Sequence, residues 1–186
     1  MKNEESKMPR GLRNNNPLNI RRTGKDQWKG LIAVVGDLKS PTSEVGDFKS
    51  PPTKSPPTKS PPMNQPTVAT PPTWDRAFCQ FESLEWGWRA AFYLLTRNYF
   101  QKHRLQTIRG IIARWAPPQD HNNTEAYIRN VCKRTGIAPD EPLGIPSEKP
   151  ARWMMLGVAM AIQENGTESL DYFAMLRGWK LLQPHP

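Results

Sequence analysis

The stretch GVAMAIQENG, residues 157–166, ends an apolar segment on a carboxylate, and the interpretation of the whole chain depends on it. From Trp153 onward the segment is apolar nearly all round, which is typical of a helix packed on every side. Pro150 suits the first turn of such a helix, and Gly166 suits its C-terminal cap. Glu164 is therefore expected to lie close to the core.

A glutamate in this position has two interpretations. The negative partial charge at the helix end and partial burial both favour a protonated carboxyl, which a general acid needs in order to give a proton to a leaving oxygen. Alternatively, Glu164 points to water while Asn165 and Gly166 close the helix in a left-handed turn. Taken alone, the residues favour the second interpretation, because most glutamates at helix ends are solvated.

The remaining periodicity predicts a mainly α fold. Apolar residues recur at helical spacing in the segments 84–103, 108–115, 124–135, 150–165 and 172–179. We expect Thr107 to cap the second helix and Gly136 to end the third. The last helix is expected to bury the face formed by Tyr172, Met175, Leu176 and Trp179. Short strands are expected at 18–35 and 77–81, which gives an α+β arrangement with a small β region near the N-terminus.

Residues 37–73 form a low-complexity insertion rich in Pro, Lys and Ser. A ten-residue unit at 35–44 recurs at 45–54, and the unit K-S-P-P-T repeats from 49 to 58. Proline at this density removes amide donors and opposes helix, so we expect a disordered or polyproline-like loop. A linker or recognition tract is one interpretation. An expanded surface loop is favoured, because long insertions cost little closure entropy, and a single domain is expected over 9–182.

Composition limits the partners. Lys and Arg outnumber Asp and Glu by 26 to 17, and a pI near 9.8 favours a polyanionic partner such as nucleic acid, an anionic membrane or bacterial cell wall. The chain has no apolar run of about 18 residues, so no membrane insertion is expected. Cys79 and Cys132 are isolated thiols without metal-site spacing, and we expect no metal, no cofactor and no disulfide.

Several motifs resemble parts of lysozyme-like cell-wall hydrolases. MAIQENG (160–166) resembles the end of the catalytic helix in lytic transglycosylases and glucosaminidases. RNNNPLNI (13–20) resembles their Asn-rich turn, QWKG (27–30) their tryptophan–glycine pair, and FCQFESLEWGWRA (78–90) their aromatic entry to a long helix. In those families these motifs follow the glutamate helix, whereas here they precede it. The order is therefore circularly permuted.

Outside the insertion, the chain is also similar to a family of phage and prophage virion structural proteins with muralytic, lysozyme-like domains. The likeness is carried by RGLRNNNPLNI (10–20), F-x-x-F-x-S-x-x-x-G-x-R-A (78–90) and IIARWAPPQDHNNTEAYI (111–128). It implies a lysozyme-like helical domain and a cell-wall target. Where that family often has Glu-Asn after the two prolines, this chain has Asp120 and His121, so a role for the acidic position does not carry over.

The resemblance implies cleavage of peptidoglycan glycan strands by a lysozyme or lytic-transglycosylase reaction, with Glu164 as general acid and then base. One carboxylate suffices where the substrate's own acetamido or hydroxyl group takes the second role. The substrate-binding residues that we expect are Asn16, Asn19, Trp28, Glu82 and Tyr127.

Except for Tyr127, each of these residues also has a structural interpretation. Asn16 and Asn19 suit sugar hydroxyl and N-acetyl groups, but Asn beside proline also suits a tight turn. Tyr127 resembles a cleft tyrosine of lysozyme-like enzymes. Trp28 and Trp115 are both suited to stack on sugar faces, although large aromatic residues in a small domain are more often core. Trp115 lies on an apolar helix stripe and is expected in the core. Glu82, near a helix start, is also explained by the helix dipole alone.

Two other functional classes remain open: a catalytically inactive phage virion structural or cell-wall-binding protein, and a nucleic-acid-binding phage protein that uses the arginines of 10–22 and 97–114. Nucleic acid is not the expected partner, because these arginines are scattered among apolar positions. The expected partners are glycan strands and phage virion components. Residues 1–13 lack the apolar core of a signal peptide, so we expect synthesis in the bacterial cytoplasm and action on the wall after release or within a virion.

Overall fold

The computed structural model describes residues 8–23, 25–32, 75 and 77–182. Helices dominate these residues, so the prediction of a mainly α protein is confirmed. In chain order the elements are α1 (Arg10–Arg13), α2 (Leu84–Tyr93), η2 (Leu94–Lys102), α3 (Ile108–Trp115), η3 (Pro118–Asp120), α4 (Thr124–Thr135), α5 (Pro150–Asn165) and α6 (Tyr172–Lys180). All of them belong to one unit, made by residues 1–32 with 76–186. The insertion predicted at 37–73 lies outside the described residues.

The β region expected at 18–35 and 77–81 is reduced to isolated contacts within the part of the chain that is described. Two antiparallel bridges join the segments, Arg21 to Phe78 and Leu31 to Phe81. The side-chain amide of Asn16 donates to the carbonyl groups of Ile20 at 3.0 Å and Cys79 at 2.9 Å. Side-chain hydrogen bonds thus replace part of the backbone ladder that strands would need.

The helix ends follow the capping residues that the sequence indicates. The Thr107 side chain accepts a hydrogen bond from the Gly110 amide at 3.1 Å, which satisfies a free donor at the start of α3. Gly136 and Gly166 adopt φ values of 69° and 64° and end α4 and α5. Because side chains disfavour this left-handed conformation, glycine fits there. The predicted caps are confirmed.

The helix expected over 84–103 changes its geometry halfway along. α2 is regular, and η2 continues it as a π-helix. Near the junction the Thr96 hydroxyl donates to the Phe92 carbonyl at 2.7 Å. A threonine that bonds back to the preceding turn competes with the regular helical pattern, and π-helical turns are frequent at functional sites. Tyr99 on this π-helix lines the cleft described below.

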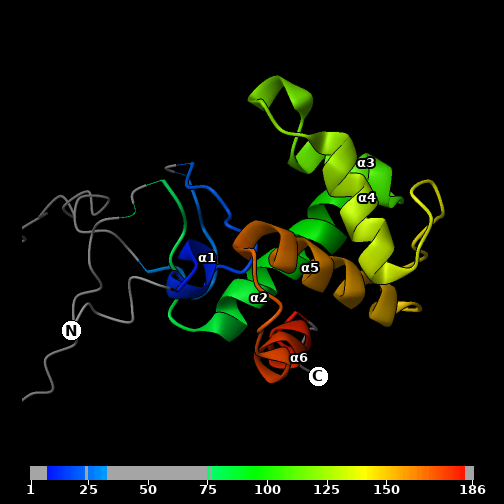
Figure 1. Cartoon of the computed structure of the whole chain (residues 1–186). Coiled ribbons are helices and arrows are strands. Elements are labelled where there is room, and N and C mark those ends of the chain that lie inside the picture. The colour runs from blue at the N-terminus through cyan, green and yellow to red at the C-terminus, as the bar shows by residue number, and fades with distance from the viewer. Residues whose placement is uncertain (1–7, 24, 33–74, 76, 183–186) are drawn as a thin grey trace, which may run out of the picture. The chain divides into compact units, whose positions relative to one another are not determined.

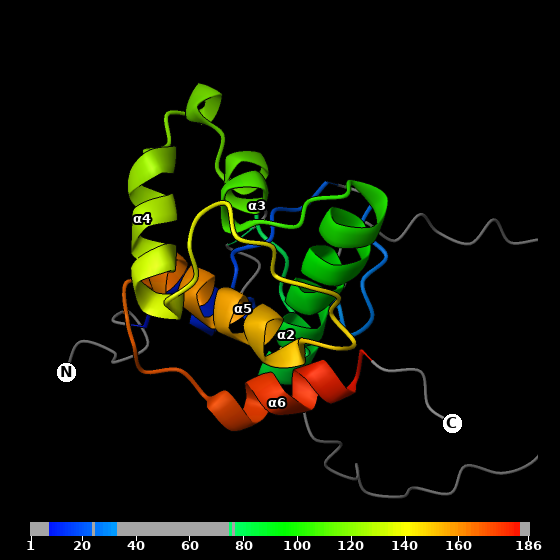
Figure 2. The same ribbon diagram turned by 90° about the vertical axis from the view of Figure 1, so that its right-hand side faces the viewer.

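α5 lies at the centre of the helical unit, where it contacts α4 and α2 (Figures 1 and 2). The close approach to α2 depends on Gly157, since a Cβ there would lie 2.7 Å from a ring atom of Phe92. The prediction that this helix is packed on every side is wrong. Met155 is 43% exposed, because α6 packs chiefly against α2 and leaves this face of α5 open.

α6 buries only part of the predicted face, because Met175 is buried and Trp179 packs against the core. Tyr172 and Leu176, which were expected inside, are 48% and 44% exposed, whereas Ala174 and Gly178 are buried. A Cβ on Gly178 would lie 2.4 Å from the Cβ of Trp88 on α2. α6 therefore approaches α2 through its smallest residues. A count of large apolar residues does not reveal such a contact.

Both cysteines are free thiols. Cys79 is fully buried, and burial raises the pKa of its thiol to about 12, so it is an unreactive core residue at neutral pH. In the described ranges no helix combines the length and the apolar character needed to cross a membrane.

Candidate active site

Glu164 lies where the end of α5 meets an open cleft of about 860 Å³. Its side chain is half-buried. The cleft lining comes from the N-terminal segment, the segment before α2, η2, the end of α3, the connection between α3 and α4, and α4 itself. It includes Arg10, Asn19, Arg21, Phe78, Tyr99, Trp115, Asp120, His121 and Tyr127. A concave surface with a few convergent polar groups is the usual form of a ligand site.

Three side chains from distant parts of the chain contact the Glu164 carboxylate. The Trp115 indole Nε1 and the Tyr127 hydroxyl both donate to Oε1 at 2.9 Å. Asn19 Nδ2 lies 3.4 Å from Oε2 and 3.3 Å from the main-chain carbonyl oxygen of Glu164. Two donors on one oxygen fix the plane of the carboxylate. Oε2, with a single long contact, is the oxygen that remains available to a ligand.

Tyr127 acts as a hydrogen-bond donor in this network. It lies on α4 and is 7% exposed. Burial raises the pKa of Tyr127 well above its ordinary value, and the charge of Glu164 and the hydrogen bond to it act in the same direction. The phenol therefore stays protonated across the neutral pH range, so its hydroxyl donates and the carboxylate accepts.

The Asn-rich turn lies beside the end of α5. The buried Asn165 side chain donates to the Pro17 carbonyl and to the Ala161 carbonyl, both at 2.8 Å. The backbones approach so closely here that a Cβ on Gly11 would lie 2.4 Å from Asn165 Oδ1. Two segments separated by more than a hundred residues in the sequence thus meet at Glu164, as the permuted order of motifs predicts.

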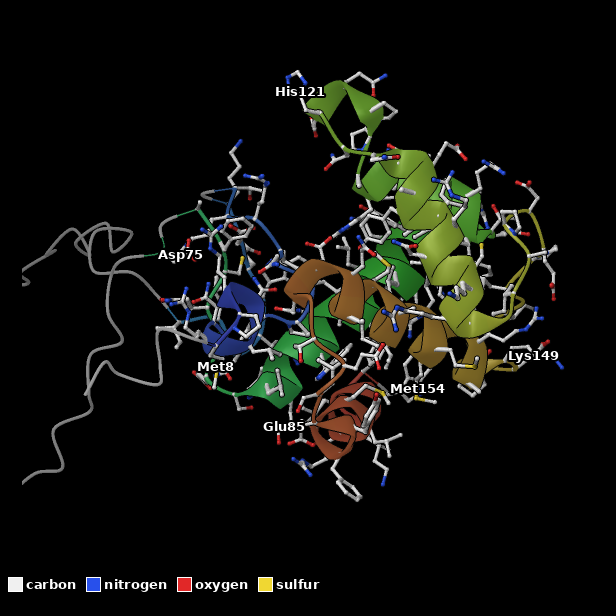
Figure 3. The ribbon with its side chains drawn as sticks, viewed as in Figure 1. Met8, Asp75, Glu85, His121, Lys149 and Met154 are labelled. Carbon is white, nitrogen blue, oxygen red and sulfur yellow. The ribbon has the colours of Figure 1, made fainter. Side chains whose placement is uncertain are left out.

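One side of the cleft carries two arginines on a shared aromatic ring. The guanidinium carbons of Arg10 and Arg21 lie 4.9 and 5.1 Å from the centroid of the Phe78 ring. A guanidinium stacked on a ring keeps its N–H groups at the edge, where they can bind a carboxylate or phosphate. Another part of the lining is the connection between α3 and α4, with His121 at its outer end (Figure 3).

Three predicted substrate-binding residues do not line the cleft. Asn16 is fully buried, and its side chain also accepts the Ile20 amide at 2.9 Å, so it shapes the turn instead of contacting a ligand. Glu82 is exposed outside the cleft, and its amide donates to the Gly30 carbonyl at 2.9 Å. Trp28 lies in a separate hollow beside α2. A motif fixes the position of a residue along the chain, but not the side of the backbone that it faces.

Trp115, predicted to be a core residue, is the site residue that the sequence interpretation missed. It is the last residue of α3, and its ring packs against the core while its N–H reaches Glu164. A tryptophan at a half-buried position hides its ring but still needs a partner for its N–H. The available signal was its place at the helix end, directly before Ala116 and the two prolines.

The arrangement is suited to proton transfer. Glu164 is an oriented carboxyl in reach of a bound group, and Asp120 is the other carboxylate among the described residues that line the cleft. A positioned carboxyl can give a proton to a leaving oxygen or take one from an attacking group. Among the described residues, no group of three or more His, Cys, Asp and Glu side chains is arranged to hold a metal ion.

A comparison with curated proteins finds one match that covers nearly the whole chain. The chain is 34% identical over 173 residues to protein P5 of Pseudoalteromonas phage PM2. The aligned region makes up 92% of this chain and 80% of protein P5. No family model matches the chain.

Proposed function

Since the chain belongs to the phage protein family of protein P5 from phage PM2, we propose that it is a phage protein that cleaves the glycan strands of peptidoglycan, with Glu164 as the acid. The helical unit around the cleft is, in this proposal, a lysozyme-like domain. The substrate-binding residues are Asn19 and Tyr127, which border the acid, together with Trp115.

One observation carries the proposal: the Glu164 carboxylate faces an open cleft and is held on one oxygen by two neutral donors. Because Oε1 already accepts hydrogen bonds from Trp115 and Tyr127, a proton on this carboxyl resides on Oε2. That oxygen has only the long contact from Asn19, so a glycosidic oxygen can approach it. The same two donors stabilise the carboxylate that remains after the proton has left.

The proposed reaction uses this geometry. Glu164 gives the proton on Oε2 to the glycosidic oxygen as the bond from that oxygen to the anomeric carbon breaks, and the leaving sugar departs as an alcohol. The acetamido or hydroxyl group of the substrate stabilises the positive charge at the anomeric carbon. The Glu164 carboxylate then takes a proton from the attacking water or sugar hydroxyl. Water leaves a reducing end, and an internal hydroxyl leaves an anhydro end.

The positive charge of the chain supports a wall substrate. Lys and Arg exceed Asp and Glu by nine, and peptidoglycan carries carboxylates on its peptide stems. Opposite charges raise the local concentration of the enzyme at the polymer and speed encounter. Arg10 and Arg21 add positive charge at the cleft itself.

A second candidate is a phage virion structural or wall-binding protein that does not cleave. Its specific support is the similarity to protein P5, a phage protein, over 92% of the chain. The cleft and the positive charge suit binding as well as they suit cleavage. The two candidates differ in one property, the dependence of glycan breakage on Glu164.

The experiment measures release of soluble fragments from purified murein, with mass analysis for anhydro or reducing ends. We expect the wild-type protein to release fragments and Glu164→Gln to release them about 10²–10⁴ times more slowly, the usual contribution of general acid catalysis. Glu82→Gln makes the same change outside the cleft and should keep the wild-type rate. Intact murein after incubation with folded wild-type protein would instead support the non-cleaving candidate.

A further inference from the structure

Trp28 lies in a second hollow of about 430 Å³, whose lining shares no residue with the cleft around Glu164. We call this hollow the Trp28 corner. Its lining includes Lys25, Asp26, Trp28, Lys29, Arg89 and Tyr93. The corner is formed by a loop of the N-terminal segment and by α2, and the proposed cleavage reaction makes no use of it.

The loop that carries Trp28 is fixed to α2 and to the segment directly before it. Gly30 has a φ of 70°, and a Cβ there would lie 2.2 Å from Cγ of the Trp86 ring. The Gly30 carbonyl accepts the Glu82 amide at 2.9 Å, and the Ile32 amide donates to the Gln80 carbonyl at 2.8 Å. The position of Trp28 is therefore set by the backbone before any ligand arrives, which lowers the entropic cost of binding.

Two aromatic rings form the walls of the corner. The rings of Trp28 and Tyr93 meet edge to face, with centroids 6.0 Å apart and planes at 83°. Tyr93 is 42% exposed and Trp28 is partly buried against the core. Amphipathic rings of this kind offer apolar surface to a ligand that also carries polar groups. Their perpendicular planes enclose an angular space instead of a flat slot.

Three cations surround these rings. Lys25 and Lys29 are exposed beside Trp28, and Arg89 is held with its guanidinium carbon 5.8 Å from the Tyr93 ring centroid. The one carboxylate in the lining, Asp26, is occupied by the loop itself. Its oxygens accept the amide of Thr23 at 2.6 Å and the hydroxyl of Thr23 at 2.9 Å. The corner therefore presents positive charge to a ligand.

We propose that the Trp28 corner is a second binding site, which takes a sugar unit of an anionic polysaccharide. The two rings pack against the apolar face and edge of one sugar, and the surrounding cations bind its acidic groups. Single-stranded nucleic acid also uses rings and cations, but successive bases stack in parallel. Rings at 83°, one of them already facing Arg89, do not offer such a stack.

The site extends the proposed function without depending on it. In a cleaving protein it would hold the chain on the wall between cleavage events, and in a non-cleaving protein it would serve adhesion alone. Binding is therefore measured in the Glu164→Gln background, where the polymer stays intact. A protein that does not cleave is then recognised by the absence of released fragments, and a corner that does not bind is recognised by an unchanged dissociation constant in its variants.

The test measures the dissociation constant for purified murein, for polygalacturonate as a soluble carboxylated polysaccharide, for neutral dextran and for a single-stranded oligonucleotide. We expect Trp28→Ala and Tyr93→Ala each to weaken binding to murein and to polygalacturonate by roughly tenfold, the scale of one lost aromatic contact. Tyr93→Ala removes a more exposed ring, so its result stands even if Trp28→Ala lowers stability. Dextran should bind weakly to every variant.

Matched controls separate the corner from general charge. Lys25→Gln with Lys29→Gln is compared with Lys133→Gln with Lys180→Gln, an exposed pair on α4 and α6 with the same change in net charge. We expect several-fold weaker binding only for the first pair. Equal losses for both pairs, or wild-type affinity after Tyr93→Ala, would overturn the proposal. Tighter binding of the oligonucleotide than of the polysaccharides, lost with Tyr93→Ala, would assign the corner to nucleic acid instead.

Discussion

The cleft around Glu164 and the Trp28 corner combine aromatic and charged residues in opposite ways. In the cleft, the polar atoms of Trp115 and Tyr127 point at a carboxylate, and their hydrogen bonds hold it in one orientation. In the corner, the ring of Trp28 contributes surface, and the three cations of the lining outnumber its one carboxylate, Asp26.

The difference separates chemistry from adhesion. Proton transfer needs one group held at a defined position. In the cleft, the N–H of Trp115 and the O–H of Tyr127 hold Glu164 in this way. Adhesion to a polymer needs contact area and opposite charge. The exposed Lys25 and Lys29 supply the charge, and this role does not require a fixed side-chain geometry. The two sites should therefore respond to mutation in different measurements.

After Glu164 itself, removal of one of the two hydrogen-bond donors to its Oε1 should have the largest effect on the rate of murein cleavage. We expect Tyr127→Phe and Trp115→Phe each to slow murein cleavage by roughly ten- to a hundredfold, since each removes a hydrogen bond to a charged group. Tyr172→Phe makes the same change at an exposed position on α6, outside both sites, and should leave the cleavage rate unchanged. Full cleavage activity in folded Tyr127→Phe would mean that the network around the carboxylate serves structure alone.

A smaller effect is expected at the wall of the cleft. Arg21 stacks on Phe78, and its guanidinium can bind the acidic groups of peptide stems. Arg21→Gln should lower kcat/KM about three- to tenfold on murein with intact stems, and much less on glycan strands from which the stems have been removed. Arg129→Gln, an exposed change on α4 outside the cleft lining, is the matched control. An equal loss of kcat/KM on both substrates would show that Arg21 does not recognise the peptide stems.

The smallest effect concerns a region outside both sites, where Glu85 lies beside α6 (Figure 3). The Ser83 side chain, the local backbone and Arg177 hold the pKa of Glu85 at about 2, below its usual 4.5. A carboxyl whose pKa is lowered by folding stabilises the folded state. This contribution is fully present above pH 4.5 and is lost as the pH falls towards 2.

At neutral pH we therefore expect Glu85→Gln to lower the Tm by about 2–4 °C at most, because the pair with Arg177 is partly exposed. The gap between the two melting curves should close as the pH approaches 2. A gap that stays constant from pH 7 to pH 2 would show that the charge of Glu85 plays no part. Neither cleavage nor binding should change.

The sequence predicts the helices well because helical spacing and caps are local properties. Thr107, Gly136 and Gly166 mark helix ends through their own backbone preferences, and the structure has ends at those residues. The faces of α5 and α6 are less predictable. Gly178 permits a close contact with α2, which the pattern of apolar residues does not predict. With α6 in this orientation, Tyr172 is exposed.

Part of the candidate site was also accessible from the sequence. Motif resemblance brought the Asn-rich turn and Glu164 together, and the turn does supply Asn19 beside the carboxylate. Trp115 was assigned to the core because helical spacing places its side chain on the apolar face of α3. The same spacing does not indicate which group the indole N–H contacts. Trp28 was expected to stack on a sugar, and a motif does not indicate that it lies in a hollow separate from Glu164. The position and orientation of both tryptophans depend on tertiary contacts, which the sequence pattern does not contain.

The central claim is that Glu164 performs chemistry while the Trp28 corner performs adhesion, and a single side-by-side measurement tests it. Wild-type protein, Glu164→Gln and Trp28→Ala are incubated with one murein preparation, and bound protein and released fragments are both quantified. We expect Glu164→Gln to bind like the wild type and to release at least about 10² times fewer fragments per unit time. Trp28→Ala should bind the murein more weakly, yet release as many fragments per bound molecule as the wild type. Fragment release by Glu164→Gln at the wild-type rate would contradict the claim.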